Sequence, residues 1–398
     1  MLGRTLESVR AQQLPPGRLI SAMPKILYFA TEDWFFASHF LPMARAAREA
    51  GFEVVVAARL GGKAQQIIDE GIRLLPLGGE RRSLSPIGGL RDFLGALAVV
   101  RSEAPDIVHC IALRPVVLGG IAAKLARVKG LVVAPTGLGQ LWVDDDFMIR
   151  IVRSVIRVLV GSWLRGGGTR YLFENGEDPR EFGLEPTDRD VAIVGGAGID
   201  QKEFPFVAEP PAPPVKVALV SRMIAPKGIA EVVEATRRAR AHAPIELHLF
   251  GDSDPTDRRS ISELRLRRWS QEPGIYWHGR TDDVAGVWRT HHIAILLSYR
   301  EGLPRTLVEA AAAGRPIVTS DCTGCREVVR DGEEGFLIAP GDIDAAARVL
   351  VKLAEDPALR GRLGAAANAR FRERFTEAAV RTAVGNLYRQ TFRAPPRC

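Results

Sequence analysis

The residues with the clearest capacity for chemistry lie in segment 298–321, where Glu301 falls in a turn and Glu309 on the helix that follows. The apolar run 293–297 predicts a buried strand before the turn, and Pro304 suits the first turn of the helix. A strand, loop, helix, strand unit of this kind builds parallel sheets, whose ligands bind beyond the carboxyl ends of the strands. The turn that carries Glu301 is therefore a candidate ligand site.

Two cations, Arg222 and Lys227, follow another predicted strand at 215–220 and should project from its carboxyl end. A guanidinium grips phosphate oxygens in bidentate fashion, and an ammonium adds a movable point charge. A carboxylate such as Glu309 can accept two hydrogen bonds from the adjacent hydroxyls of a ribose. The alternative to phosphate binding is that Arg222 and Lys227 are solvated cations of a loop, and the alternative to ribose binding is that Glu309 is a solvated helix residue. The position of the two cations at the same sheet edge as Glu301 favours phosphate binding. For Glu309, considered without its neighbours, the solvated interpretation is favoured.

The elements that must position these residues alternate between apolar strands and amphipathic helices. In the first half we expect a helix at 41–50 and strands at 26–30, 53–58, 72–76, 106–110, 131–134, 170–173 and 191–194. In the second half we expect helices at 229–241 and 306–313 and strands at 215–220, 246–250, 274–278, 293–297 and 316–319. The alternation predicts an α/β fold with two doubly wound, Rossmann-like parallel-sheet domains that face each other across a cleft.

The proline-rich stretch 205–214 cannot continue a helix or a central strand, so it is the natural linker between the domains. It separates a first domain at 23–204 from a second at 215–375. A last helix is expected at 376–392, with Thr376 as its cap. Residues 1–22 lack the apolar core of a signal peptide, and we interpret them as a disordered leader or as an artefact of the assigned start.

Composition narrows the class of protein. The 398 residues with 46% apolar content can bury two sizeable cores, and the net charge of +7 suggests phosphates, anionic lipid or nucleic acid as partners. Four cysteines in so long a chain indicate a reducing compartment. Cys322 and Cys325 form a CxxC pair, but no further ligands are near enough in sequence to predict a metal site. No uncharged apolar run is long enough to span a membrane.

Taken together, the motifs of the second domain resemble glycosyltransferase family 4. Segment 221–228 reads SRM, three further residues, then KG, and Glu301 and Glu309 stand with seven residues between them. The remaining matches to the family pattern are Gly324, Glu327, Gly332, Gly335 and Leu337. The resemblance covers essentially all of the second domain. It implies a GT-B fold and a retaining, metal-independent hexosyltransferase that needs no cofactor and uses a nucleoside-diphosphate sugar as donor.

The resemblance also implies roles for individual residues. The donor would be held by Arg222, Lys227, Glu301, Gly302, Leu303 and Glu309. Glu309 would bind the ribose, the two cations the diphosphate, and Glu301 with the amides that follow it the donor sugar. Cations fixed in advance stabilise the charge that develops on a departing phosphate, so Arg222 and Lys227 would take the place of a metal ion.

The first domain would bind the acceptor, and its signal is weaker. Segment 35–38 reads FFAS where many family members carry a glycine pair. Segments near positions 39, 109 and 136 resemble the members of the family that extend lipid-linked sugars. The acceptor-side candidates are His39, Arg81, Arg82, Thr136 and Gly137. His109 is a catalytic candidate beside Glu301, Arg222 and Lys227, although either histidine equally fits a structural role.

Residues 147–164 predict a basic amphipathic helix, with Arg150, Arg153 and Arg157 on one side and a broad apolar face opposite. Such a helix can lie in the interface of an anionic membrane. A core helix with a solvated arginine edge fits the same pattern equally well.

The sequence thus predicts a cytoplasmic glycosyltransferase, peripheral on the inner face of the plasma membrane, that acts in surface polysaccharide or glycan assembly. Its partners would be a nucleotide-sugar donor, a polyprenyl-diphosphate-linked saccharide and an anionic membrane surface, with no nucleic acid. One alternative is a nucleotide-sugar 2-epimerase of the same architecture, which would need acid and base residues that the sequence does not identify. Another is a nucleotide-sugar-binding protein without turnover.

Overall fold

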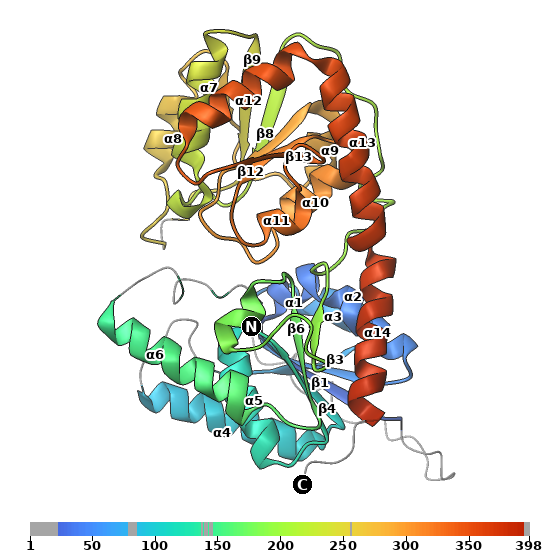
Figure 1. Ribbon diagram of the computed structural model, residues 1–398. Helices are drawn as coiled ribbons and strands as arrows, with labels where there is room; N and C mark the ends of the chain where they lie inside the picture. The colour runs from blue at the N-terminus through green and yellow to red at the C-terminus, as the bar shows by residue number, and fades with distance from the viewer. Residues whose placement is uncertain are drawn as a thin grey trace, which may run out of the picture.

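The computed structural model describes residues 23–78, 86–136, 138, 142, 146–254 and 257–393. The predicted leader at 1–22 and the candidate residues Arg81, Arg82 and Gly137 lie outside the described residues. Figure 1 shows two α/β lobes, one above the other, joined at their facing ends.

The first domain is built on a seven-stranded sheet in the order β3-β2-β1-β4-β5-β6-β7, with every neighbouring pair parallel. Its strands are β1 (Lys25–Glu32), β2 (Glu53–Arg59), β3 (Arg73–Pro76), β4 (Ile107–Ile111), β5 (Gly130–Ala134), β6 (Thr169–Phe173) and β7 (Val191–Ile193). The connecting helices are α1 (Asp33–His39), α2 (Leu41–Glu49), α3 (Ala64–Asp69), α4 (Pro86–Glu103), α5 (Leu113–Leu125) and α6 (Phe147–Val158). A π-helical turn at Leu159–Trp163 extends α6, and a 3-10 turn occupies Asp178–Phe182.

The second domain is built on a six-stranded parallel sheet in the order β10-β9-β8-β11-β12-β13. Its strands are β8 (Val215–Val220), β9 (Ile245–Phe250), β10 (Ile275–Trp277), β11 (Ile293–Leu296), β12 (Ile317–Ser320) and β13 (Gly335–Ile338). Its helices are α7 (Ile229–Arg240), α8 (Glu263–Trp269), α9 (Val284–Thr290), α10 (Arg305–Ala312), α11 (Cys325–Val328), α12 (Ile343–Glu355) and α13 (Pro357–Arg374).

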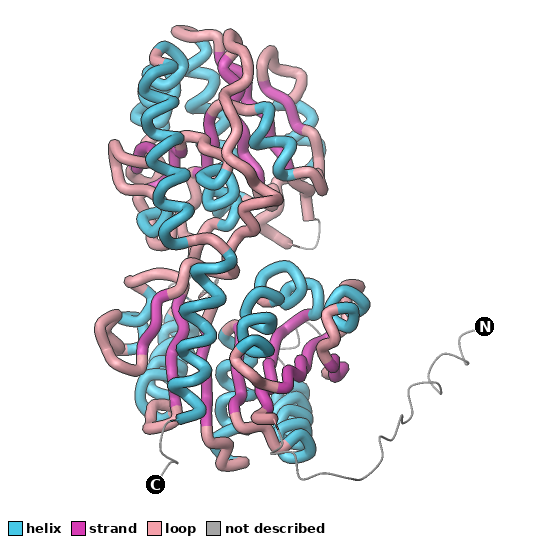
Figure 2. The backbone as a smooth tube through the Cα atoms, turned by 90° about the vertical axis from the view of Figure 1, so that its right-hand side faces the viewer, coloured by secondary structure: helices cyan, strands magenta, loops and turns pink. Residues whose placement is uncertain are grey.

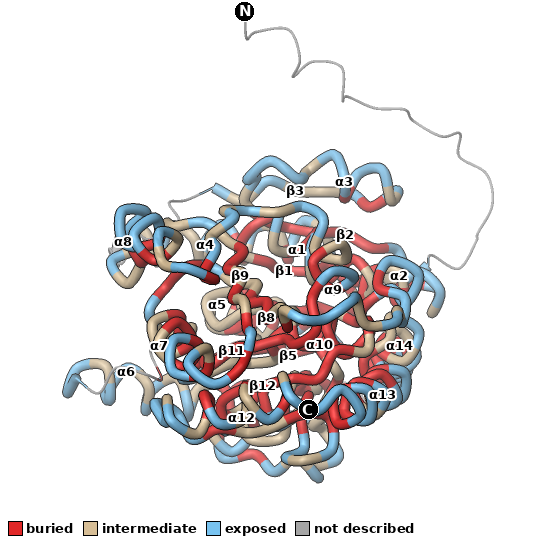
Figure 3. The backbone as a smooth tube through the Cα atoms, turned by 90° about the horizontal axis from the view of Figure 1, so that it is seen from above, coloured by how far each residue is buried: buried red, intermediate tan, exposed pale blue. Residues whose placement is uncertain are grey.

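Both sheets are buried because helices cover both of their faces, as parallel sheets require. In the first domain, strand side chains of one face pack with α2, and those of the other face pack with α4 and α5. The view from above shows most of the strands as buried segments inside a layer of helices whose outer sides are exposed, with the edge strand β3 half-buried to exposed (Figure 3).

The last helix, α14 (Glu377–Arg393), returns to the first domain, where it packs mainly on α2. Figures 1 and 2 show α13 and α14 running in succession along one side of both lobes. Val380, Val384 and Tyr388 are fully or almost fully buried in the first domain's core. The Tyr388 hydroxyl lies 2.7 Å from that of Tyr28 on β1. Thr376 caps α14 by accepting a hydrogen bond from the Ala379 amide, as the sequence predicts.

The connection between β7 and β8 contains no helix or strand, in keeping with its prolines. It is held against the second domain by a buried arginine, Arg315, which donates to the carbonyls of Val207 and Ala208. Arg360 binds Glu209 of the same stretch at 2.9 Å. The linker is thus fastened to the second domain and does not hang free between the two.

The predicted strands agree with those of the structure to within one or two residues at each end. The sequence predicted bounds for only some of the helices, and it did not predict α1 or β13. Segment 35–38 belongs to helix α1, whose aromatic residues hide the spacing of apolar positions by three and four residues that marks an amphipathic helix. Strand β13 includes Gly335 and Leu337 of the matched glycine motif. Pro304 precedes α10 as its N-cap residue and does not lie inside the first turn.

Candidate active site

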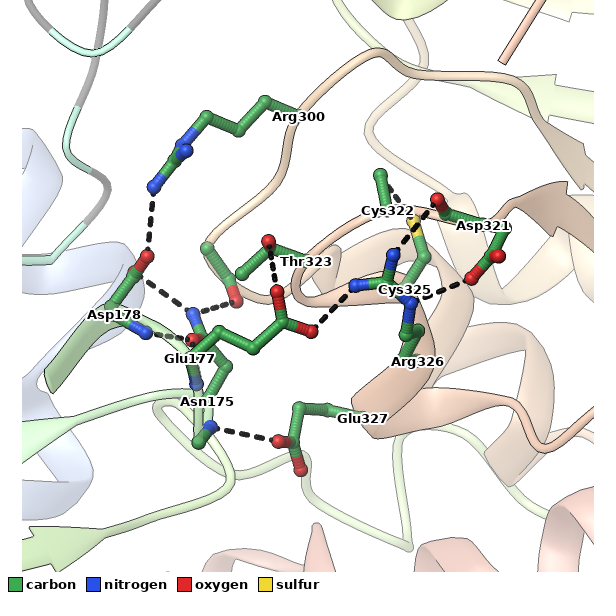
Figure 4. A network of polar contacts seen from close by, with 12 residues as sticks. Asn175, Glu177, Asp178, Arg300, Asp321, Cys322, Thr323, Cys325, Arg326 and Glu327 are labelled. Carbon is green, nitrogen blue, oxygen red and sulfur yellow. Dashed lines mark hydrogen bonds and ion pairs between the residues drawn. The ribbon is translucent and has the colours of Figure 1, made fainter. Parts of the chain in front are cut away.

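The two domains meet where the loop after β6 contacts the loops after β11 and β12. The Asn175 side chain donates to the Gly302 carbonyl at 2.9 Å, and Arg300 pairs with Asp178 at 2.9 Å. Glu177 accepts hydrogen bonds from Thr323 and Arg326 (Figure 4). The carboxyl ends of the two sheets therefore face each other across a polar contact, and the loop that holds Glu301 lies beside it.

Lys227 and Glu301 form an ion pair, with 2.5 Å between Nζ and Oε1. They meet because Gly228, at φ 69°, lets the 3-10 turn Ala225–Lys227 approach the end of β11. A Cβ at position 228 would lie 2.0 Å from the Leu297 carbonyl oxygen, so only glycine fits. The ammonium has three donor hydrogens, and after binding Glu301 it can still bind a ligand anion.

Glu309 lies on α10 and is buried, with its carboxylate 2.8 Å from Nε of Arg305 one turn earlier. Burial raises the pKa of Glu309, and the Arg305 guanidinium opposes that rise. Arg305 also donates to the Ser38 carbonyl of the first domain. The solvated interpretation of Glu309 is therefore wrong, because the carboxylate is held in a buried pair close to the domain boundary.

Arg222 is exposed at the carboxyl end of β8 and lines a groove of about 360 Å³. The groove is also lined by Phe250, Gly251 and Asp252, which end and follow β9, and by Arg280. The groove has an aromatic side chain, two guanidiniums and carboxylates at the strand ends where α/β sheets bind their ligands. Among the described donor-side candidates, Arg222 alone lines this groove.

Glu174 is a site residue that the sequence analysis missed. It follows β6 and lines a cavity of about 20 Å³ between the domains together with His39, Gly196 and Leu303. Burial, with the nearby carboxylates of Asp178 and Glu301, raises the pKa of Glu174 to about 7. Its position directly after a predicted strand was a signal, but its partners lie on loops distant in sequence. A carboxyl that titrates near neutral pH can both donate and accept a hydrogen bond.

His39 reaches the same interdomain cavity from the end of α1. Burial and the Arg305 cation lower the pKa of His39 to about 4, so the imidazole is neutral at physiological pH. Thr136 follows β5, and its buried hydroxyl has no hydrogen-bond partner within the described part of the chain. Both residues thus lie at the carboxyl edge of the first sheet, and their role in acceptor binding stays a prediction.

His109 does not lie in the cleft, and the prediction that it is catalytic needs correction. It occupies the middle of β4 with no exposed surface, and its Nδ1 is 2.9 Å from the Tyr388 hydroxyl. Burial lowers the pKa of His109 to about 3. Because the side chain is enclosed by β1 and α14, it is a core histidine that cannot touch a substrate in this arrangement.

The CxxC cysteines lie beside the same loops, with their sulfur atoms 3.6 Å apart and the thiols free. Within the ranges that the structure describes, no group of three or more His, Cys, Asp or Glu side chains could hold a metal ion. The sequence has three adjacent aspartates at 144–146, a pattern that could suggest a metal site. The last of them, Asp146, caps α6 by accepting a hydrogen bond from the Met148 amide. Positions 144 and 145 lie outside the described residues.

Helix α6 presents its apolar side chains to solvent. No residue of the helix is buried. The exposed fractions of Phe147, Met148, Ile151, Val152, Val155 and Val158 range from 42% to 66%. Arg157 pairs with Glu181. The interpretation as a core helix is therefore wrong. None of the helices in the described ranges is long and apolar enough to cross a bilayer.

Two family models match the chain, one in each domain. Residues 25–158 match the model described as "Glycosyl transferase 4-like". Residues 214–356 match the model described as "Glycosyl transferases group 1".

Two bacterial enzymes are similar over most of the chain. One is the N,N'-diacetylbacillosaminyl-diphospho-undecaprenol alpha-1,3-N-acetylgalactosaminyltransferase of Campylobacter jejuni, 26% identical over 81% of this chain and 87% of its own. The other is the UDP-Gal:alpha-D-GlcNAc-diphosphoundecaprenol alpha-1,3-galactosyltransferase of Escherichia coli, 22% identical over 77% of this chain and 81% of its own.

Solved structures share the fold. The Anabaena protein HepE, in complex with UDP and glucose, superposes with a TM-score of 0.73 at 17% identity over 92% of this chain and 99% of its own. WaaG, a glycosyltransferase involved in lipopolysaccharide biosynthesis, gives a TM-score of 0.63 at 14% identity over 91% and 99%.

Proposed function

We propose that this chain, a glycosyltransferase with the GT-B fold, transfers a sugar from a nucleoside diphosphate to a polyprenyl-diphosphate-linked saccharide. The names of the Campylobacter and Escherichia relatives, which carry diphospho-undecaprenol acceptors, support this acceptor class. The reaction would serve the assembly of a surface polysaccharide or another glycan.

The observation that carries the proposal is the Lys227–Glu301 pair at the carboxyl edge of the second sheet. When the bond between the sugar and the diphosphate breaks, negative charge develops on the departing phosphate. An ammonium already fixed at that edge stabilises this charge without reorganisation. Glu301 holds the ammonium in place and keeps a second oxygen for the donor sugar.

The other donor residues have complementary parts in the proposal. Arg222 would bind the diphosphate from its groove, and Glu309 would bind the ribose once Arg305 gives way. The acceptor hydroxyl would attack the anomeric carbon while its proton passes to the departing phosphate. Retention of the anomeric configuration, a hexose as the transferred sugar and independence of metal belong to the same proposal, on the strength of the family resemblance.

On the acceptor side we assign His39 and Thr136, which lie at the carboxyl edge of the first sheet. The neutral His39 imidazole can accept a hydrogen bond from a saccharide hydroxyl or donate one to it. Arg81, Arg82 and Gly137 stay predictions from the sequence.

A transfer assay separates this proposal from its alternatives. The protein is incubated with a panel of nucleoside-diphosphate sugars and a polyprenyl-diphosphate-linked saccharide, and the products are resolved by mass spectrometry. Transfer of sugar to the lipid-linked saccharide is the expected result. An epimerised nucleotide sugar without transfer would establish the epimerase, and tight donor binding with neither product would establish the binding protein.

The acceptor is lipid-linked, so we further propose that α6 attaches the enzyme to the inner face of an anionic membrane. The outward apolar side chains would enter the interface while Arg150, Arg153 and Arg157 bind phosphate headgroups. Replacing the three arginines with glutamine should reduce sedimentation with vesicles containing phosphatidylglycerol. Replacing Arg267, Arg268 and Arg280 of the second domain with glutamine is the control. Equal vesicle binding by both triple variants and the parent would contradict the attachment.

A further inference from the structure

Another cavity, larger than the one that holds Glu174, lies within the first domain, between the sheet and helices α4 and α5. It has a volume of about 240 Å³, and none of the donor-side candidates lines it. Its walls include the ends of β1 and β2, the residues after β3 and the start of α5. The cavity therefore opens at the carboxyl edge of the first sheet, the same edge that carries Glu174 and the interdomain cavity.

The walls divide into an apolar part and a cationic part. Phe29, Ala30, Leu77, Ala96 and Leu118 form an aliphatic and aromatic floor. Arg59, Arg91 and Arg114 also line the cavity, with Asp92 as the one acid among the lining residues. The lining thus favours a ligand with a hydrocarbon part and a strongly anionic part.

Two of the three arginines are held in position by ion pairs. Arg59 is held by Glu32 at 2.9 Å, and Arg114 by Asp92 at 2.5 Å. Arg114 also stands in the first turn of α5, which has no side-chain cap and whose amino end carries positive partial charge. Arg91 is exposed and forms no ion pair within the described ranges. Guanidiniums held in this way bind phosphate oxygens in pairs.

The cavity also lies beside an exposed apolar surface. Helices α4, α5 and the end of α6 cover one face of the sheet and share one core. On the outside of this layer Leu90 and Leu94 of α4 are 59% and 54% exposed, and α6 exposes the apolar side chains described above. A lipid that reaches this layer from a membrane would meet the cavity next.

We propose that this cavity binds the isoprenoid diphosphate part of the acceptor, with the first isoprene units on the apolar floor and the diphosphate against the arginines. The proposal deepens the function proposed above and rests on it. The saccharide attached to the diphosphate would extend along the sheet edge toward Glu174 and Glu301. A free sugar is a poorer fit, because the floor offers carbon atoms and few hydrogen-bonding groups.

Geranyl diphosphate, a soluble isoprenoid diphosphate, tests the cavity in the full-length protein by titration calorimetry. We expect it to bind at least tenfold more tightly than inorganic pyrophosphate or geraniol. Gly95 lines the cavity on α4 and has open space where a Cβ would be. Gly95→Phe should therefore fill the cavity and weaken geranyl diphosphate binding at least tenfold, and Arg91→Gln should weaken it severalfold. The matched control is Gly89→Phe on the same helix, because Gly89 also has open space but does not line the cavity.

One further variant keeps the outcomes separate. Lys227→Ala should leave geranyl diphosphate binding unchanged, since a loss would mean that the ligand occupies the donor site. Binding unaffected by both Gly95→Phe and Arg91→Gln, or equal affinity for pyrophosphate, would overturn the cavity assignment even if the enzyme transfers sugar to lipid-linked acceptors. Cavity-dependent binding without any such transfer would instead overturn the proposed function and leave the cavity assignment standing.

Discussion

The carboxyl edges of the two sheets differ in the side chains that line them and in the segments that supply those side chains. At the edge of the second sheet, charged side chains from short local motifs are already paired, as Lys227 is with Glu301 and Arg305 with Glu309. At the edge of the first sheet the cavities are lined by glycine backbone, apolar side chains, three arginines and groups contributed by distant segments. In the proposed function, the donor is therefore recognised by charges from short local motifs, whereas the acceptor is recognised by an apolar floor and by charges gathered from several segments.

The largest effect should come from the second domain's ammonium. Lys227→Ala should lower kcat/KM about 100-fold, or about 2.7 kcal/mol, because the charge of the departing phosphate loses its preorganised partner. The measurement is initial-rate kinetics with the donor and acceptor found in the transfer assay. Lys202→Ala, at an exposed position after β7, is the control. A loss below threefold would place the charge stabilisation elsewhere.

A smaller loss is expected at the two residues that we propose bind the donor away from the breaking bond. Arg222→Ala and Glu309→Ala should each lower kcat/KM roughly tenfold, about 1.4 kcal/mol. Arg267→Ala, a mostly exposed arginine on α8, serves as the control. Unchanged kinetics in both variants would remove the donor assignment and with it the contrast between the two edges.

A third prediction brings the two edges together through Glu174, which belongs to the first domain but interacts with Glu301 of the second. The pKa of about 7 means that kcat/KM should change with pH around neutrality, and that Glu174→Gln should flatten this change. The folded state keeps the proton that the unfolded state loses near pH 4.5, so stability falls as pH rises from there to about 7.

The difference in melting temperature, Glu174→Gln minus parent, should therefore be larger at pH 8 than at pH 4.5. Glu185→Gln, on an exposed loop, is the control. A parent pH profile that the Glu174→Gln variant reproduces without change would show that Glu174 does not titrate near neutrality.

The smallest effect on activity is expected inside the first domain. Tyr388→Phe removes the hydroxyl that contacts Tyr28 and His109, which should lower the free energy of unfolding by about 1–2 kcal/mol. The kinetic constants should stay as they are, because His109 only fills the core. Denaturant unfolding and initial rates measure the two quantities. A tenfold loss of kcat without loss of stability would instead indicate that His109 takes part in catalysis.

The sequence predicted the two sheets because mostly apolar strands alternate with helices, a pattern that located every strand of the structure except β13. The sequence also predicted that Lys227 and Glu301 lie at one edge of the second sheet, because each stands in the loop that follows a predicted strand. His109 was misjudged because its partner, Tyr388, lies 279 positions later. Glu174 was missed for the same reason, as its environment depends on the Glu301 loop of the other domain.

The return of α14 to the first domain also affects how the protein is made. On the ribosome, β1 to β7 emerge long before Val380, Val384 and Tyr388, which complete their core. At about 5–20 residues per second, translation of the intervening domain takes on the order of ten seconds or more. During that interval the nascent first domain exposes the apolar surface that α14 later covers, so it is a natural client for chaperones. A nonsense mutation that removes α14 would leave this apolar surface exposed permanently, and it would destabilise the first domain, which was synthesised first.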